Sequence, residues 1–574
     1  MTNPGRIALV LAVGAALSSA LLPAQGTADP NLDRAHHVLR RITFGPDRAL
    51  VARLAAGLTE VNAYIAEQLN PPAQGAPNYR GSQSLDELFV GAGGGPGTLG
   101  LPATLGGPID DLDTSQAQIA YALESEWQLR EVMAQFWERH FNTFLFAQRN
   151  YFVPWIGGAT EDYWAWWFEW EANEHYRANA LTTFHDLLVF TAHHASMMIY
   201  LHMPQNNGAN PNEDFARELC ELYTMSPEQV LPGEVVVKNY EQSDIENIAR
   251  ILTGWDLDEA NGFVFQFDDA DHAYPTGPTA LFGGSTQPVS IPARVSPNGE
   301  QEGLDLLAEL AKHPATKAFV SRKLIAHFVG EELAAAPTSS VLTAMLAAWG
   351  DEGDIVAVLG ALFASPQFLG SDSHLTRIRM PLESVVATVR ALEGTIREDP
   401  TTGLADPASL NSMNLAMAAQ GQSLLKYPAP NGYQTDDASQ LSPSVGIERA
   451  YWGWNVLFSL LGSPPGSWSP ATDPVAYVQP VQPPLPASPT RTNVVPHLYA
   501  VVDYLLTSFY GSNYTEADEF RVREAIAGTI LWIDQNPAGT TYGGPWDPAV
   551  AEHYEAVIWV ACTAALGFVQ SGQR

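Results

Sequence analysis

The sequence has very few cysteines and little positive charge. Only Cys220 and Cys562 occur among 574 residues, which excludes a disulfide-dense scaffold and any metal site built from several cysteines. The two can form one disulfide in an oxidising compartment or remain separate buried thiols. The 29 Lys and Arg residues are outnumbered by 63 Asp and Glu residues, giving a formal net charge of -34. This acidic chain would repel phosphate backbones, so we expect no nucleic-acid partner.

Several familiar catalytic motifs are also missing. The sequence contains no GxSxG elbow, no Walker A lysine loop, no HExxH and no CxxC. These absences exclude the hydrolases, nucleotidases and zinc proteases that are recognised by such motifs. Enzymes built from dispersed carboxylates and histidines stay open.

The N-terminus has the layout of a secretory signal peptide. Arg6 is followed by an apolar run from Ile7 to Leu22 and then by small residues, with Ala24 and Gly26 placed for cleavage. The run is marginal for a membrane span and has no stop-transfer flank. We therefore expect residues 1–26 to be removed and the mature chain, without a transmembrane span, to be periplasmic, on the cell surface or secreted.

The rest of the chain predicts a mainly α fold with a small β-hairpin element and long loops rich in Gly and Pro. Apolar residues recur at helical spacing through most segments, and 46% of all residues are hydrophobic. We expect a main helical domain over 27–461, a proline-rich connection over 462–494, and a C-terminal helical block over 495–574 that packs on the main domain. Within the main domain, 114–147 predicts one long helix and the segment from Gly262 a hairpin. The segment from 243 predicts a helix with Ser243 as N-cap and Glu246 completing a capping box.

A stripe of charged residues marks "NEDFARELCELYTM" (212–225). Helical spacing places Phe215, Leu219 and Leu222 on the buried side and the charged residues opposite. The simpler interpretation is an ordinary surface helix with an i,i+4 pair between Glu213 and Arg217. The alternative is a functional site or a buried polar network.

The same helix is part of a family resemblance. "LRRITFGP", "FWERHF", "NEDFARELCELYTM", "DIENIARILTGW", "HPATKAFVSRKLIAHFV", "LFASPQF" and "RMPLESVVATVRAL" follow one another in this order. Together they resemble the bacterial family called domain of unknown function 1800, whose members are typically exported. The resemblance implies fold class and export but no reaction. It also implies a role for a set of polar positions: Asn212, Glu213, Arg217, Glu218 and Glu221.

This chain departs from the family pattern at two places. Family members often carry His where Tyr223 stands. Their hairpin often reads His-Asp followed by a lysine, where this chain has Asp271, His272 and Ala273. A metal or proton-transfer site that used those residues would be altered or lost here.

Other candidate residues lie outside the stripe. His140 is a candidate ligand or general base, and with Glu218 and His272 it would make an oxygen and nitrogen site for a divalent metal. Four potentially basic residues follow on a later helix, and we expect them to pair with the 213–221 carboxylates or to bind an anion: His313, Lys317, Arg322 and Lys323. For three tryptophans core packing is the default interpretation, and an exposed shelf that stacks sugars or aromatic polymers is the rival: Trp164, Trp166 and Trp167.

These patterns leave two classes of function. The favoured one is an exported binding or assembly protein of the envelope, with an envelope protein or a polysaccharide as partner. The alternative is a hydrolase or metal-assisted enzyme acting on an extracellular polymer through Glu213, Glu218, Glu221 and His140, oriented by Arg217. No motif in the sequence indicates a particular cofactor, although a divalent metal would fit the enzyme alternative.

Overall fold

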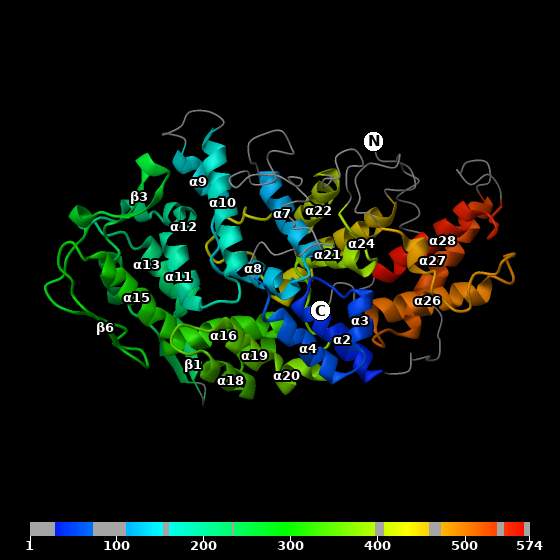
Figure 1. Cartoon of the computed structure of the whole chain (residues 1–574), viewed down its shortest axis with the longest axis horizontal. Helices are drawn as coiled ribbons and strands as arrows, with labels where there is room; N and C mark the ends of the chain where they lie inside the picture. Colours follow the sequence, from blue (N-terminus) through cyan, green and yellow to red (C-terminus); the bar gives the residue numbers. More distant parts are fainter. Residues whose placement is uncertain are drawn as a thin grey trace. The chain divides into compact units, whose positions relative to one another are not determined.

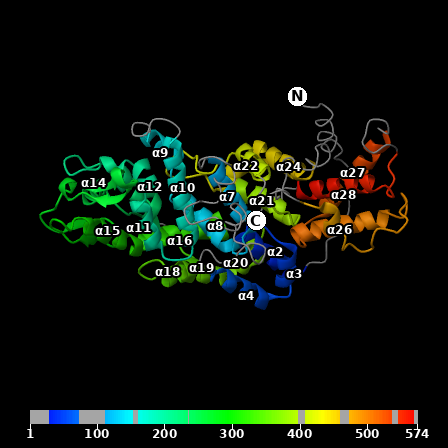
Figure 2. The same cartoon turned by 45° about the horizontal axis from the view of Figure 1, so that its top comes forward.

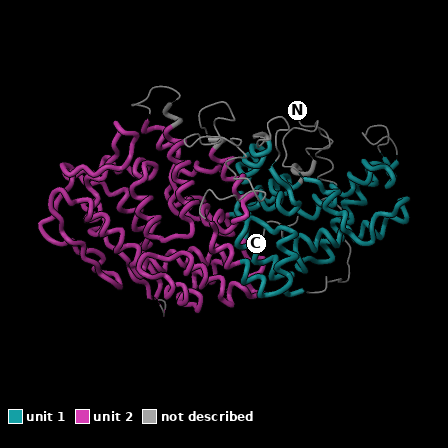
Figure 3. The backbone as a smooth tube through the Cα atoms, viewed as in Figure 1, with its two compact units in different colours: residues 1–64, 378–421, 440–574 teal, residues 65–377, 422–439 magenta. Residues whose placement is uncertain are grey.

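The computed structural model describes residues 29–72, 111–152, 160–231, 233, 235–396, 407–458, 472–535 and 545–567. The expected signal peptide, 1–26, lies outside these residues, as does the first part of the proline-rich connection, so both stay predictions. The described chain forms two compact units (Figure 3). Unit 1 comprises residues 1–64, 378–421 and 440–574, and unit 2 comprises 65–377 and 422–439.

The fold is mainly α, as the sequence predicts (Figure 1). The helices of unit 1 are α2 (Pro30–Ile42), α3 (Arg48–Leu54), α21 (Pro381–Ala391), α22 (Pro407–Ala419), α24 (Pro443–Phe458), α25 (Pro474–Tyr477), α26 (Val495–Tyr510), α27 (Glu516–Gln535) and α28 (Ala551–Leu566). Two more cross a unit boundary: α4 (Leu58–Gln68) and α23 (Asp437–Gln440). In unit 1, α28 is apolar and buried along most of its length and packs against α24, α25, α26 and α27.

Unit 2 holds the remaining helices and the described strands. Its helices are α7 (Asp111–Glu124), α8 (Gln128–His140), α9 (Leu145–Phe152), α10 (Thr160–Ala178), α11 (Phe184–His193), α12 (Ala195–Tyr200), α13 (Asp214–Glu218), α14 (Gln242–Ile251), α15 (Glu300–Lys312), α16 (Pro314–Phe328), α17 (Glu331–Ala335), α18 (Ser340–Ala348), α19 (Ile355–Phe363) and α20 (Pro366–Leu369), with the π-helical segment η2 (Leu219–Thr224). Within this unit α10 packs against α7, α8, α9 and α12 (Figures 1 and 2).

Each β element in the described residues is an antiparallel pair. The pairs are β1 (Glu228–Leu231) with β2 (Val235–Lys238), β3 (Trp255–Asp258) with β4 (Val264–Phe267), and β5 (Thr279–Leu281) with β6 (Val289–Ile291). The predicted hairpin is therefore displaced. Val264–Phe267 is a strand, but its partner precedes it, because Trp255 and Leu257 alternate with polar residues and are buried.

Helix starts follow local capping chemistry, although one predicted cap is wrong. Pro314 lies in the first turn of α16, and the His313 side chain caps that helix. Helix α14 begins at Gln242 instead of after Ser243. Its reciprocal cap joins Glu241 to Asp244, whose carboxylate accepts the Glu241 backbone N–H at 2.8 Å.

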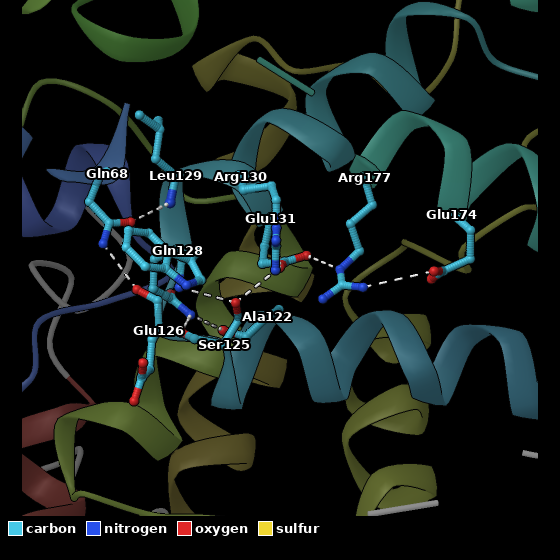
Figure 4. A network of polar contacts seen from close by, with 11 residues as sticks. Gln68, Ala122, Ser125, Glu126, Gln128, Leu129, Arg130, Glu131, Glu174 and Arg177 are labelled. Atoms are coloured by element: carbon cyan, nitrogen blue, oxygen red, sulfur yellow. Dashed lines mark hydrogen bonds and ion pairs between the residues drawn. The ribbon is translucent and has the colours of Figure 1, made fainter. Parts of the chain in front are cut away.

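The long helix predicted over 114–147 is also wrong, because α7, α8 and α9 are separate. Gln128 donates its side-chain amide to the carbonyls of Ala122 and Ser125, at 3.0 and 2.8 Å, and so satisfies the last turn of α7 (Figure 4). The hydroxyl of Ser125 in turn donates to Glu131 at 2.9 Å. Local side-chain hydrogen bonds therefore stabilise the break between α7 and α8.

Glu131 is the centre of a buried ion network at this break (Figure 4). It accepts the Arg177 guanidinium at 2.8 Å and the Arg130 guanidinium at 3.1 Å, and all three side chains are under 5% exposed. Burial raises the pKa of Glu131, but the two guanidiniums outweigh it and hold that pKa below its ordinary value. This network ties α10 to α8 and is structural.

Cys220 and Cys562 are both buried and free, which matches the two-thiol alternative. Among the described residues, no helix is both long enough and apolar enough to cross a bilayer.

Candidate functional site

The charged stripe lies on a helix that changes its hydrogen-bond pattern halfway. α13 is α-helical, but from Leu219 the chain continues as the π-helix η2. A π turn adds a residue, so the buried position moves from Leu222, which is only half-buried, to Tyr223, which is 1% exposed. The predicted burial of Phe215 and Leu219 is confirmed, and that of Leu222 is wrong for this reason. π turns are frequent at functional sites.

The first half of the stripe is a surface ion network. Arg217 donates to Glu213 at 2.8 Å, and Gln242 on α14 donates to the same Glu213 oxygen at 2.8 Å. Arg217 and Glu213 are 40% and 36% exposed, so the predicted i,i+4 pair is confirmed as a solvated one. The side-chain oxygen of Asn212 accepts the Asp214 backbone N–H at 2.8 Å, just before the helix.

The second half of the stripe lies closer to the interior. Glu218 and Glu221 are half-buried. Burial and the nearby Glu221 raise the pKa of Glu218, against the opposing effect of Arg217. Glu218 also helps to raise the pKa of the Tyr223 phenol, after burial itself and Tyr200.

His140, at the C-terminal end of α8, is 2% exposed and reaches this π turn. Its Nε2 lies 2.9 Å from the Tyr223 carbonyl oxygen. Because a carbonyl oxygen only accepts, Nε2 carries the proton and Nδ1 is left as an acceptor. Since the contact uses the Tyr223 backbone, it does not depend on which side chain stands at 223.

The partner of Nδ1 is Lys323 on α16, whose Nζ lies 2.7 Å away. Lys323 is half-buried, and burial together with Arg139 lowers the pKa of its amine to about 7. Burial and Lys323 likewise hold the pKa of His140 well below its ordinary value. Near neutral pH the pair therefore consists of a neutral imidazole and an amine that is uncharged in about half of the molecules, and we call it the Lys323–His140 pair.

Aromatic rings surround the pair. The His140 ring centroid lies 4.6 Å from that of Phe141 and within 6.3 Å of those of Phe184 and Phe319. The Lys323 Nζ lies 5.3 Å from the Phe319 ring centroid. Burial disfavours charge on the amine and strengthens the hydrogen bond between the two residues, whereas the face of the Phe319 ring attracts the charged form.

Two acidic residues of the same unit have pKa values far above those of ordinary carboxylates, and the sequence interpretation missed both. Burial raises the pKa of Glu138 to about 7 and that of Glu169 to about 8. The Thr143 hydroxyl lies 2.8 Å from one Glu169 oxygen and 2.9 Å from the other. The available signal was local: Glu169 is a lone acid between Phe168 and Trp170.

A loop of unit 2 covers the end of α8. Asn142 donates to the carbonyls of Tyr427 and Ala429, at 3.2 and 2.9 Å, and the Tyr200 hydroxyl donates to that of Pro428 at 2.8 Å. Gly432 of this loop has a φ of +69° and lies against the backbone at the end of α8. A Cβ added to it would lie 2.8 Å from the Arg139 carbonyl oxygen. The loop thereby fixes the position of the helix end that carries His140.

The expected pairing of the basic residues on α16 with the stripe carboxylates is wrong. Lys317 donates to the Gly350 carbonyl at 2.6 Å, and His313 contacts that of Gln287 at 2.9 Å. Arg322 donates to backbone carbonyls at the end of α17, among them that of Pro337 at 3.0 Å. Only Lys323 of this set contacts another predicted site residue, His140.

The structure places the remaining candidates apart from the pair. His272 lies near β3 and β4, with Nδ1 2.7 Å from the Thr253 carbonyl oxygen. Trp166 is buried, whereas Trp164 and Trp167 are half-buried, and Trp164 stacks on Phe168 with centroids 5.6 Å apart. Within the described ranges, no three His, Cys, Asp or Glu side chains gather closely enough to hold a metal ion.

Comparison with known proteins identifies the family but no activity. Searches of curated proteins and of solved structures gave no match. A family model described as "Protein of unknown function (DUF1800)" matches residues 37–538, which is most of the chain. The protein therefore belongs to the DUF1800 family.

Proposed function

We propose that this protein is an exported enzyme that performs acid–base chemistry at the Lys323–His140 pair. The observation that carries the proposal is the 2.7 Å contact between Lys323 Nζ and His140 Nδ1. His140 is itself oriented by the Tyr223 carbonyl. A reactive group, a second base within hydrogen-bond reach and a third group that orients the base are the usual parts of an activated site.

The charge state supports the same function. A general base is most effective when its pKa lies near the working pH, and the Lys323 amine has a pKa of about 7. The uncharged amine can take a proton from a substrate or from water, while His140 holds the amine in position. Burial keeps the amine uncharged more readily than it would be at the surface.

The proposed location rests on the N-terminal sequence. A positive residue, an apolar run and small residues suit export, and the acidic composition suits a protein that works in solution outside the cytoplasm. Periplasm, cell surface and medium all fit this proposal. Peptide sequencing of the mature N-terminus would test it, and an intact Met1 in the cell-free medium or periplasm would contradict cleavage.

The enzymatic proposal is tested by comparing two lysine variants. Purified full-length protein would be screened with glycosides, esters and peptides from envelope polymers, and with small aldehydes and ketones. We expect turnover that falls at least ~100-fold in Lys323→Met, the usual scale for loss of a general base. Lys312→Met is the matched control, because Lys312 is 39% exposed and pairs with Glu309 on its own helix. Equal turnover in both variants would contradict the assignment.

A second function, binding or assembly in the envelope, is favoured by the β1–β2 hairpin. Val230, Val235 and Val236 are 44%, 54% and 57% exposed, and β1 and β2 pair only with each other in the described residues. A lone two-stranded hairpin with exposed apolar side chains suits addition of a partner strand. Replacing Val235 and Val236 by Ser should abolish co-sedimentation with isolated envelopes, and unchanged co-sedimentation would contradict this function.

A further inference from the structure

Lys323 stands out among the lysines of the chain. The whole sequence contains only five: Lys238, Lys312, Lys317, Lys323 and Lys426. Lys238 and Lys312 each pair with a carboxylate three residues away and are 61% and 39% exposed. A lysine is rarely taken into the interior unless it is paired with an acid, because desolvating an ammonium ion is costly. Lys323 instead contacts a neutral base.

The hydrogen-bond arrangement fixes the direction of the Lys323 lone pair. His140 Nδ1 accepts one N–H of the amine, because Nε2 carries the proton that is donated to the Tyr223 carbonyl. A neutral amine that donates one hydrogen in this way keeps its lone pair free and directed away from the imidazole. Such an amine is a nucleophile, since protonation is what normally blocks lysine at neutral pH.

We propose that Lys323 is a covalent attachment site for a small aldehyde or ketone, which it binds as an imine. This inference rests on the proposed function and names the substrate class of the same site: a carbonyl compound. It requires only an amine, a proton acceptor and a proton donor, all present in the pair.

The bond changes balance without any further reagent. The Nζ lone pair attacks the carbonyl carbon, a C–N bond forms, and the C=O π electrons move to oxygen. His140 Nδ1 accepts the first proton that Nζ releases and returns it to the oxygen, which gives a carbinolamine. The nitrogen lone pair then forms the C=N bond as the C–O bond breaks, and Nδ1 carries the second Nζ proton to the departing hydroxide. The products are a C=N bond on Lys323 and one water molecule.

The four other lysines supply internal controls for the test. At pH 7 about half of an amine with a pKa of 7 is uncharged, against roughly 1 in 3,000 for one with a pKa of 10.5. The full-length protein would be incubated with glycolaldehyde and sodium cyanoborohydride, and modified lysines would be mapped by peptide mass spectrometry. We expect Lys323 to be modified at least about tenfold faster than Lys312, and His140→Gln to remove that advantage.

A parallel acetylation experiment separates the two proposals. Trace acetic anhydride would be applied between pH 5 and 11, and the rate at each lysine recorded. Rapid imine trapping with an acetylation midpoint near pH 7 is the expected result. The same midpoint without imine trapping would overturn the carbonyl inference but leave Lys323 as a base. A midpoint near pH 10 would overturn both, and circular dichroism would verify that every variant is folded.

Discussion

Replacing Glu131 by Gln should cost far more stability than the same change at the surface. Glu131→Gln keeps the size and one acceptor oxygen of the side chain but removes its charge. Two guanidiniums that are each 4% exposed, Arg130 and Arg177, then stay buried without their central counter-ion. Breaking a buried ion pair by removing one partner costs about 3–5 kcal/mol. Because Gln still accepts one hydrogen bond, we expect the lower end, about 3 kcal/mol.

The matched control is Glu213→Gln, which makes the same chemical change in a solvated pair. Arg217 and Glu213 are 40% and 36% exposed, so the loss should stay below about 1 kcal/mol. Urea unfolding followed by tryptophan fluorescence suits both variants, because urea does not screen charges as a guanidinium salt would.

The pH dependence gives the same prediction a second readout. The pKa of Glu131 is lowered in the folded protein, so its stabilising effect is complete above about pH 4.5, its ordinary value. That effect is lost as the pH falls through the folded pKa. The gap between wild type and Glu131→Gln should therefore close in acid. Equal costs for Glu131→Gln and Glu213→Gln at pH 7 would refute the reasoning.

Two further changes test the surroundings of the pair. Burial raises the pKa of Glu169 to about 8 in the folded protein, whereas the unfolded chain loses this proton near pH 4.5. The free energy of unfolding therefore decreases as the pH rises from about 4.5 to about 8. Glu169→Gln should remove that fall in unfolding experiments at pH 5.5 and 9, and identical pH slopes would speak against it. Gly432→Ala should destabilise by roughly 1–3 kcal/mol, because φ is +69° and the new Cβ would meet the Arg139 carbonyl. Thermal unfolding would measure this loss of stability. Gly360→Ala is the control, because Gly360 lies in α19 with open space around its Cβ position. That variant should be more stable than the wild type by up to about 1 kcal/mol.

Sequence periodicity predicted the helical fold because apolar spacing and caps act over a few residues. The mainly α class and the surface pair of Glu213 with Arg217 both depend on such local spacing. The errors also have local causes. The π turn at Leu219 shifts the buried face by one residue, and an ideal helical wheel places Leu222 where Tyr223 lies.

The candidate site could be predicted only in part. His140 and Lys323 were both candidates, but they are 183 residues apart in sequence and no periodic pattern links them. The basic residues of α16 were expected to pair with acids, since charge complementarity was the only information available. These basic residues instead contact backbone carbonyls and an imidazole, and those contacts depend on how α8, α16 and η2 pack. The spacing of residues within a single sequence does not predict that packing.

The most direct test of this account is the titration of Lys323 in the folded full-length protein. Selective ¹³C labelling of lysine would give five side-chain signals, one for each lysine in the chain. Assignment with Lys323→Met and a repeat in His140→Gln would identify the signal of interest and its dependence on the imidazole. We predict that the Lys323 signal titrates near pH 7. Titration of all five signals near pH 10 would contradict the Lys323–His140 pair as an acid–base site.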